Sequence, residues 1–277
     1  MSIPIAFSFA SCNSGGGNSP GNSDSAAIQI NPSQMKQIGS VDERFQSYNV
    51  EMVEVVGGEF WKPYHLMDSL PSAAAASNYD VSQSNEAMYR KLSPIDLTDK
   101  RLMNLAKGLA PAYVRVSGTW ANAIYFQDND EPKITKAPAG FVNVLTRNEW
   151  KGVVNFIKAT DSKLVTSFAV SNGIRDANGV WTSKEAQKID SYTKRLGGEI
   201  AAAELFNEPT MPTAGGEMNK NYNGGNFAKD VAVFKNWARK ETPNMLLLGP
   251  GSVGEGIQGV SFAMGGMSIL PTDAMML

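Results

Sequence analysis

The sequence predicts an α/β protein of the (β/α)8 TIM-barrel class. From about residue 40, apolar strand-like segments alternate with amphipathic helix-like segments, and this alternation is typical of a parallel sheet with helices outside it. Small and polar residues follow the predicted strands, which is where barrel enzymes carry their sites. A doubly wound sheet is the competing architecture, but it normally has a glycine-rich phosphate turn after its first strand. Residues 57–61 read GGEFW instead, so we favour the barrel.

Five segments predict β-strands. The first alternates in polarity and is rich in β-forming residues, and the other four are short apolar runs. They are residues 45–55, 112–118, 163–170, 199–207 and 244–250. A complete (β/α)8 barrel needs eight strands. We therefore expect an incomplete barrel of about five β/α units, which lacks the C-terminal strands and ends before a sixth strand.

Four amphipathic segments predict helices between these strands. Thr98 and Thr146 are placed to act as N-caps of the first two, and Gly197 stands just past the end of the third. In the first two segments, apolar residues recur at three- and four-residue spacing and so share one helix face. The predicted helices are 97–109, 146–160, 183–197 and 226–241.

The composition narrows the chemistry. A chain of 277 residues with 42% hydrophobic and 19% charged residues can form a globular core. The net charge of -2 offers no basic block for a nucleic acid. One Cys and one His exclude an internal disulfide and a His-rich metal site, and no G-x-S-x-G turn accompanies His65. We therefore expect no metal and no cofactor, and chemistry based on carboxylates, amides and hydroxyls.

The N-terminal segment differs from the rest of the chain. Residues 1–12, MSIPIAFSFASC, are apolar and end in small residues and Cys12, whereas residues 13–28 are mostly Gly, Ser and Asn. Residues 1–12 resemble the end of a bacterial lipoprotein signal peptide, with Cys12 as the lipidated residue. Residues 13–28 would then be a flexible tether, and residues 29–277 the N-terminal portion of the barrel. The sequence departs from the signal-peptide pattern because no basic residue precedes the apolar run.

The lipoprotein interpretation has consequences for location. It implies an exported protein, held at the bacterial cell envelope or secreted, that meets a membrane only through the lipid anchor. The alternative is a disordered N-terminus with an incidental Cys12.

The stretch AAAELFNEPTMP, residues 201–212, holds the candidate for catalysis. An apolar strand ends here in Asn207, Glu208 and Pro209. Hydrolysis of a glycosidic bond needs a carboxylic acid that protonates the leaving oxygen, held at the end of a rigid element. Asn207 can hydrogen-bond a sugar hydroxyl, and Pro209 ends the strand. The same tripeptide also fits an ordinary strand-to-loop exit.

Further stretches of the sequence support the interpretation of Glu208 as a catalytic acid. Residues 102–126, LMNLAKGLAPAYVRVSGTWANAIYF, precede AELFNEP and LLLGPG along the chain. In this order and spacing they resemble the heparanase and β-glucuronidase family, glycoside hydrolase family 79, over roughly residues 45–260. The resemblance implies a retaining (β/α)8 glycosidase, exo- or endo-acting on glycans that contain glucuronic acid or related sugars. It implies Glu208 as the acid/base and Asn207 as a ligand of the sugar.

The same comparison suggests further substrate contacts. Glu51, in NVEMVE, is implied as a ligand of a substrate hydroxyl; otherwise it faces a solvated loop. Thr119 and Trp120 would line the floor of the pocket, although Trp120 would serve equally well in core packing.

The loop after the third strand offers a third group of candidates. Ser171, Asn172 and Arg175 could reach a substrate carboxylate, and we retain Asn172 as a substrate-binding candidate. For Arg175 we expect instead an ion pair with Asp176 or exposure to solvent.

The resemblance also implies a second catalytic Glu, the nucleophile, on a seventh strand. Glu217, Glu241 and Glu255 do not stand in a matching setting. We therefore expect a truncated hydrolase that is inactive alone and whose partner is an oligo- or polysaccharide. The alternatives are a non-catalytic glycan-binding lipoprotein and a glycosidase of the same clan that acts on arabinosides or xylosides.

Overall fold

The computed structural model describes residues 31–63, 89–213, 215, 218–252 and 274–276. The chain divides into two compact units, Met1–Ser40 and Val41–Leu277. In the first unit, the described part contains one short 3-10 turn, η1, Pro32–Gln34. Several sequence predictions lie outside the described residues: the lipidated Cys12, the tether 13–28, and the residues His65, Glu217 and Glu255.

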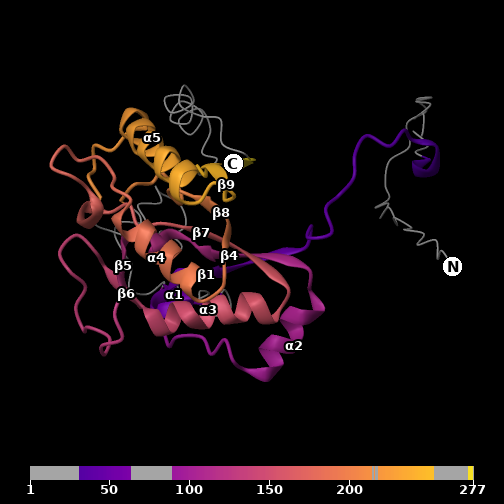
Figure 1. The fold of residues 1–277 in the computed structure, drawn as a ribbon, viewed down its shortest axis with the longest axis horizontal. Coiled ribbons are helices and arrows are strands. Elements are labelled where there is room, and N and C mark those ends of the chain that lie inside the picture. The colour runs from indigo at the N-terminus through magenta and orange to yellow at the C-terminus, as the bar shows by residue number, and fades with distance from the viewer. Residues whose placement is uncertain (1–30, 64–88, 214, 216–217, 253–273, 277) are drawn as a thin grey trace, which may run out of the picture. The chain divides into compact units, whose positions relative to one another are not determined.

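A six-stranded parallel sheet organises the second unit (Figure 1). The strands follow the order β1-β4-β7-β8-β9-β10, so each strand pairs with the next strand of this sheet along the chain. A doubly wound sheet would reverse its order at a switch point, whereas this steady progression is compatible with a (β/α) barrel. The strands are β1 Ser47–Glu51, β4 Ala112–Ser117, β7 Ser162–Ser167, β8 Ile200–Glu204, β9 Leu246–Pro250 and β10 Ala274–Met276.

The mixed α/β class and the parallel sheet are confirmed, and the fold is compatible with a TIM-like barrel. No pairing closes the sheet between β1 and β10 within the described ranges. The expectation that the chain ends before a sixth strand is wrong, because β10 pairs with β9 in parallel. Two small sheets were not predicted: β2 Gly58–Trp61 with β3 Tyr89–Leu92, antiparallel, and β5 Ile124–Gln127 with β6 Asn143–Thr146, parallel.

The predicted first strand is half right. Only Ser47–Glu51 pairs with β4, and Met52–Val56 form a short helix, α1. Met52 and Val53 are fully buried, as are Val55 and Val56 one turn further on. This spacing of three and four suits a helix whose apolar face enters the core. Apolar β-forming residues therefore continue past the end of the strand without extending it.

Four longer helices lie where the sequence predicts them, and they flank the sheet in Figure 1. They are α2 Lys100–Gly108, α3 Arg147–Ala159, α4 Lys184–Arg195 and α5 Gly224–Glu241. Gly197 follows α4 with φ of 68°, as expected of a glycine beyond a helix end. The N-cap of α2 is Asp99 and not Thr98, because the Asp99 carboxylate accepts from the Leu102 N–H at 2.8 Å.

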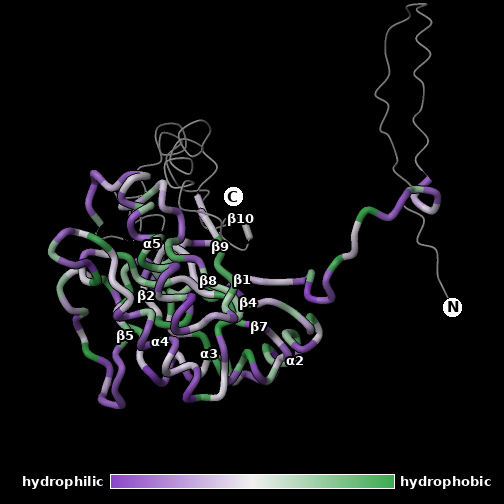
Figure 2. The backbone as a smooth tube through the Cα atoms, turned by 45° about the horizontal axis from the view of Figure 1, so that its top comes forward, coloured by the Kyte–Doolittle hydropathy of each residue, from purple (hydrophilic) through white to green (hydrophobic). Residues whose placement is uncertain are grey.

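The core forms where helices cover the sheet. Trp150 of α3 is fully buried, and its indole N–H donates to Thr193 of α4 at 2.8 Å. Phe168, Trp181 and Phe234 form an aromatic cluster against α5, with ring centroids about 6 Å apart. Hydrophobic stretches run through the region of the strands in Figure 2, and hydrophilic ones predominate in the loops around them. None of the described helices is long and apolar enough to cross a membrane.

The caps of α3 and α4 provide a test of local stability. Thr146 accepts from the Glu149 N–H at 3.2 Å, and the Glu149 carboxylate accepts from the Thr146 N–H at 2.7 Å. We expect Thr146→Ala to lower the free energy of unfolding by about 0.5–2 kcal/mol, because the cap bond is lost. Ser183 makes no side-chain cap bond at α4, so Ser183→Ala is the matched control. Equal losses for the two variants in urea unfolding would contradict this assignment.

Candidate active site

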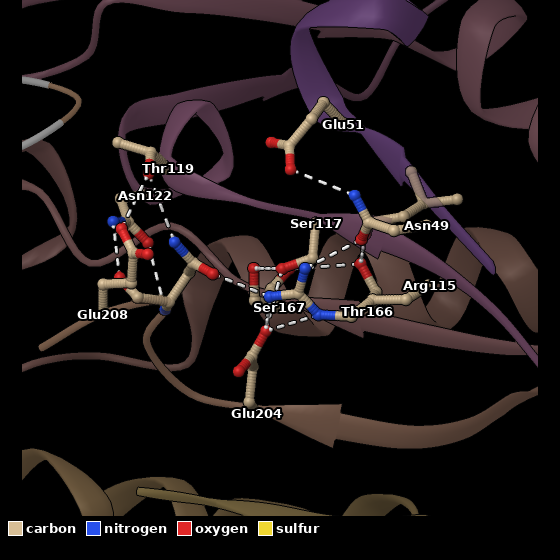
Figure 3. A network of polar contacts seen from close by, with 12 residues as sticks. Asn49, Glu51, Arg115, Ser117, Thr119, Asn122, Thr166, Ser167, Glu204 and Glu208 are labelled. Carbon is tan, nitrogen blue, oxygen red and sulfur yellow. Dashed lines mark hydrogen bonds and ion pairs between the residues drawn. The ribbon is translucent and has the colours of Figure 1, made fainter. Parts of the chain in front are cut away.

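The carboxyl ends of four strands bring polar side chains to one edge of the sheet (Figure 3). Glu51 ends β1, Ser117 ends β4, Ser167 ends β7 and Glu204 ends β8. The strands are parallel neighbours, so their carboxyl ends share one edge. Ser117 Oγ lies 2.6 Å from Oγ of Ser167 and 3.0 Å from Oε1 of Glu204, which joins three strands directly.

A buried ion pair lies at the centre of this edge. Arg115 of β4 binds Glu204 through Nε at 3.0 Å and through a second, shorter contact from Nη2. The Glu204 side chain is only 2% exposed, and a Cβ at Gly251 would stand 2.9 Å from its Oε2. Burial raises the pKa of Glu204, while the charge and hydrogen bonds of Arg115 act in the opposite direction.

Arg115 also links two asparagines. Its Nη1 donates to Oδ1 of Asn49 on β1 at 2.8 Å, and its Nη2 donates to Oδ1 of Asn207 at 2.7 Å. Since a guanidinium group has donors and no acceptor, both amide oxygens must face Arg115. The NH2 groups of Asn49 and Asn207 are therefore directed away from it, toward Glu51 and Thr119 respectively.

Asn207 and Glu208 are held in place on both sides. The backbone of Asn207 pairs with the side chain of Asn122, which donates to its carbonyl at 2.9 Å and accepts from its N–H at 3.3 Å. Glu208 has a positive φ of 57°, which is uncommon for a residue other than glycine, and its N–H donates to Gly251 at 3.0 Å. Thr119 donates to Glu208 Oε2 at 3.1 Å.

Glu51 stands at the same edge in a different environment. Its Oε1 accepts from Asn49 at 3.0 Å, whereas its Oε2 is shielded from solvent and has no hydrogen-bond partner. Gly118 makes room for this carboxylate, because a Cβ there would overlap it. Burial raises the pKa of Glu51 to about 7, against the lowering effect of Arg115 and Asn49. The nearby charges of Glu54 and Glu208 raise it further.

Comparison with known proteins places this arrangement in a family. The model of the N-terminal domain of glycosyl hydrolase family 79 matches residues 73–254, a span that includes β4, β7, β8 and β9. The chain belongs to glycosyl hydrolase family 79. The resemblance seen in the sequence is thereby confirmed.

A curated relative of this family 79 chain is a hyaluronoglucuronidase from Hirudo nipponia. The two are 28% identical over 146 residues, which covers 43% of this chain and 29% of the relative. The chain thus spans less than a third of that protein's length.

Within the family 79 chain, the structure brings most of the predicted site residues together. Asn207, Glu208 and Thr119 contact one another, and Glu51 joins them through Asn49 and Arg115. Glu51 is not on a solvated loop, since it ends β1 with one oxygen shielded from solvent. The roles assigned to these residues stay predictions.

Trp120 and Asn172 are placed differently. Trp120 is half-buried and packs edge-on against Phe60 at 5.1 Å between centroids, with Trp61 at 6.3 Å. Asn172 is exposed at the start of η6, Asn172–Ile174, and no described contact joins its side chain to the network. Trp120 therefore belongs to an aromatic cluster beside Thr119, and a direct role of Asn172 has no support in these contacts.

The expectation for Arg175 is wrong. Its side chain is 8% exposed, and its Nη1 lies 2.9 Å from Oδ2 of Asp230, on α5, instead of pairing with Asp176. Its guanidinium also lies over the ring of Tyr222, 5.1 Å from the centroid. A buried carboxylate on a packed helix attracts the guanidinium more strongly than an exposed neighbour in the loop, because water screens the latter.

Sequence reasoning missed several members of the network, among them Asn49, Arg115, Asn122 and Glu204. One signal was available for two of them. Arg115 interrupts AYVRVS and Glu204 ends AAAE, both apolar strands. Since a charge inside a sheet must be paired, one basic and one acidic residue in apolar strands indicate that each needs a partner of opposite charge.

The environment of Glu51 predicts an effect on stability. Its pKa rises from 4.5 unfolded to about 7 folded, so the folded protein binds more protons between these values. Stability should therefore fall as the pH rises through this window. Glu51→Gln cannot titrate, so its stability relative to wild type should increase from about pH 4.5 to about pH 7. The measurement is urea unfolding at several pH values.

The control for this measurement is the exposed Glu131. Glu131→Gln should keep the wild-type dependence of stability on pH. If stability changes with pH in the same way for wild type and Glu51→Gln, then Glu51 has the same pKa in the folded and unfolded protein, which contradicts this prediction.

Proposed function

We propose that this chain is the acid/base-bearing part of a retaining glycoside hydrolase that acts on glucuronic-acid-type glycans. In this proposal Glu208 is the general acid and base, Asn207 binds a sugar hydroxyl, and Glu51 binds a second hydroxyl. One observation carries it. Glu208 follows β8 at the carboxyl edge of the sheet, with Thr119 on one oxygen and the fixed amide of Asn207 beside it, inside the family 79 match.

The chemistry assigned to Glu208 has two stages. Protonated Glu208 gives its proton to the glycosidic oxygen as the bond to the sugar breaks, while a second carboxylate attacks the anomeric carbon. Glu208, now ionised, then takes a proton from the water that hydrolyses the glycosyl-enzyme. The two carboxyl groups of such a pair lie roughly 5–5.5 Å apart.

Neither of the other carboxylates at this edge suits the role of nucleophile. Glu204 is buried and bound by Arg115 and Ser117. Burial raises the pKa of Glu51 to about 7, so a large fraction of it is neutral near that pH, and a neutral carboxyl is a poor nucleophile. We therefore propose that the nucleophile comes from outside the 277 residues, which agrees with the 29% coverage of the leech relative.

The substrate class in this proposal has two supports. The family resemblance implies uronic-acid-containing glycans, and the matched relative is named a hyaluronoglucuronidase. Export with a lipid on Cys12 is also part of the proposal, and it rests on the sequence of residues 1–28 alone.

A hydrolysis assay tests the function. An aryl β-glucuronide is offered to the 277-residue chain and to a longer polypeptide that supplies the remaining strands of the barrel. We expect turnover by the longer form only, and a loss of about 10²- to 10⁴-fold in Glu208→Gln, the usual contribution of a general acid–base. Glu131→Gln, on an exposed side chain, should retain full activity.

Two results would overturn this assignment. Full activity of Glu208→Gln in the longer form would remove Glu208 from the chemistry. Glu208-dependent turnover by the 277-residue chain would show that a carboxylate within it, with Glu51 as the first candidate, completes the pair.

A further inference from the structure

Thr119 occupies a position that the proposed function does not explain. Its hydroxyl oxygen lies 3.3 Å from Nδ2 of Asn207 and 3.1 Å from Oε2 of Glu208. It therefore contacts both residues of the Asn-Glu pair. Figure 3 shows Thr119 above Glu208.

The direction of every hydrogen bond in this group follows from Arg115. The guanidinium can only donate, so its bond of 2.7 Å fixes the amide oxygen of Asn207 on that side. The amide NH2 of Asn207 must then face Thr119, where it donates to Oγ1. Oγ1 accepts this bond through a lone pair, and its own proton remains free to bind Glu208 Oε2.

Arg115 and Asn207, the first two residues of this series of hydrogen bonds, are held rigidly. Arg115 is held by Glu204, whose side chain is 2% exposed. Asn122 binds both backbone groups of Asn207. Neither Arg115 nor Asn207 can therefore turn without breaking several other bonds.

Thr119 itself is fixed from the opposite side. It begins η5, Thr119–Ala123. The loop that follows Glu208 packs on its backbone, since a Cβ at Gly215 would overlap the Thr119 carbonyl oxygen. The hydroxyl is thus set between Asn207 and Glu208 by the backbone on both sides.

We propose that Thr119 is a positioning residue that holds Glu208 Oε2 as an acceptor and so assigns the transferable proton to Oε1. A proton on Oε2 would make that oxygen a weaker acceptor for the Thr119 hydroxyl, and the contacts of the described residues offer the hydroxyl no other acceptor. Oε1 is then the oxygen that protonates the leaving group and later takes the proton from water. This inference rests on the proposed role of Glu208 as acid/base.

The surrounding charges do not make this choice between the two oxygens. The charge of Glu208 acts on Glu51 of β1 and on Glu204 of β8, and Arg115 of β4 is bound to Glu204. None of these interactions is a hydrogen bond to one oxygen of Glu208. The hydrogen bond from Thr119 is a direct contact to one named oxygen, and it therefore decides where the proton resides.

Carbon-13 NMR of the 277-residue chain tests the contact without any turnover. The side-chain carboxyl resonance of Glu208 is the one that disappears in Glu208→Gln. We expect it to shift in Thr119→Val, which removes the hydroxyl, and to return in Thr119→Ser, which restores it. Thr98→Val is the matched control, since Thr98 donates to Asp96 at 2.6 Å on the surface. It should shift the Asp96 resonance and leave that of Glu208 unchanged.

A measurement on the unaltered chain tests the direction of the bond. In equal parts of H2O and D2O, the Cβ resonance of Thr119 splits in two when its hydroxyl proton is held in a hydrogen bond and exchanges slowly. We expect the splitting to persist while the pH is lowered and Glu208 takes up its proton. Loss of the splitting at that step would place the proton on Oε2.

Two other results would contradict the inference. If the Glu208 resonance does not move in Thr119→Val, while the Asp96 resonance shifts in Thr98→Val, then Thr119 makes no hydrogen bond to Glu208. A single Cβ line for Thr119 at every pH would mean that its hydroxyl is free. Failure of the hydrolysis assay, by contrast, would concern the proposed function and would leave these NMR results as they stand.

Discussion

The buried ion pair between Arg115 and Glu204 is the interaction on which the candidate site depends. Glu204 is 2% exposed at the end of β8, so its charge has little water to stabilise it. Removal of one partner from such a pair typically costs about 3–5 kcal/mol, since the other charge is left buried and unpaired. The guanidinium also orients Asn49 and Asn207, and so connects β1, β4 and the segment after β8. The pair thereby fixes the relative positions of strand ends that carry the chemistry.

Three carboxylates at one edge have distinct environments because of this pair. Glu204 neutralises Arg115, and Glu51 lies against Gly118 with one oxygen unpartnered and a pKa raised to about 7 by burial. Glu208 receives a hydrogen bond from Thr119. Separate environments allow groups of one chemical type to take separate roles. The site is therefore defined less by its acidic residues than by the neutral amides and hydroxyls between them.

The sequence predicted much of the fold because apolar periodicity and strand–helix alternation are local signals. All four long helices and the five strands of the predicted sheet are present. The signal failed at Met52–Val56, where the residues favour strands but tertiary packing selects a helix. It also failed for Arg175, because its partner Asp230 lies 55 positions away on another helix. No local pattern specifies such a contact.

The candidate site was predicted in part for the same reason. Asn207 and Glu208 stand at a strand end within a recognisable motif. Arg115 and Glu204 belong to strands on either side of β7, and only the parallel register shows that they meet. Asn122 acts on Asn207 from 85 positions away. Residues that hold others in place are specified by three-dimensional neighbours, whereas the proposed acid/base stands in a recognisable motif just after its strand.

Chemical rescue tests the central claim, that Glu208 is the acid/base of a retaining family 79 hydrolase, most directly. The longer polypeptide with Glu208→Ala is given a dinitrophenyl β-glucuronide, whose leaving group departs without an acid, and azide is added. Azide needs no base to attack the glycosyl-enzyme. The account predicts faster turnover with azide and a β-glucuronosyl azide as product. No acceleration, or an α-azide, would contradict it, since an α-azide would make Glu208 the nucleophile.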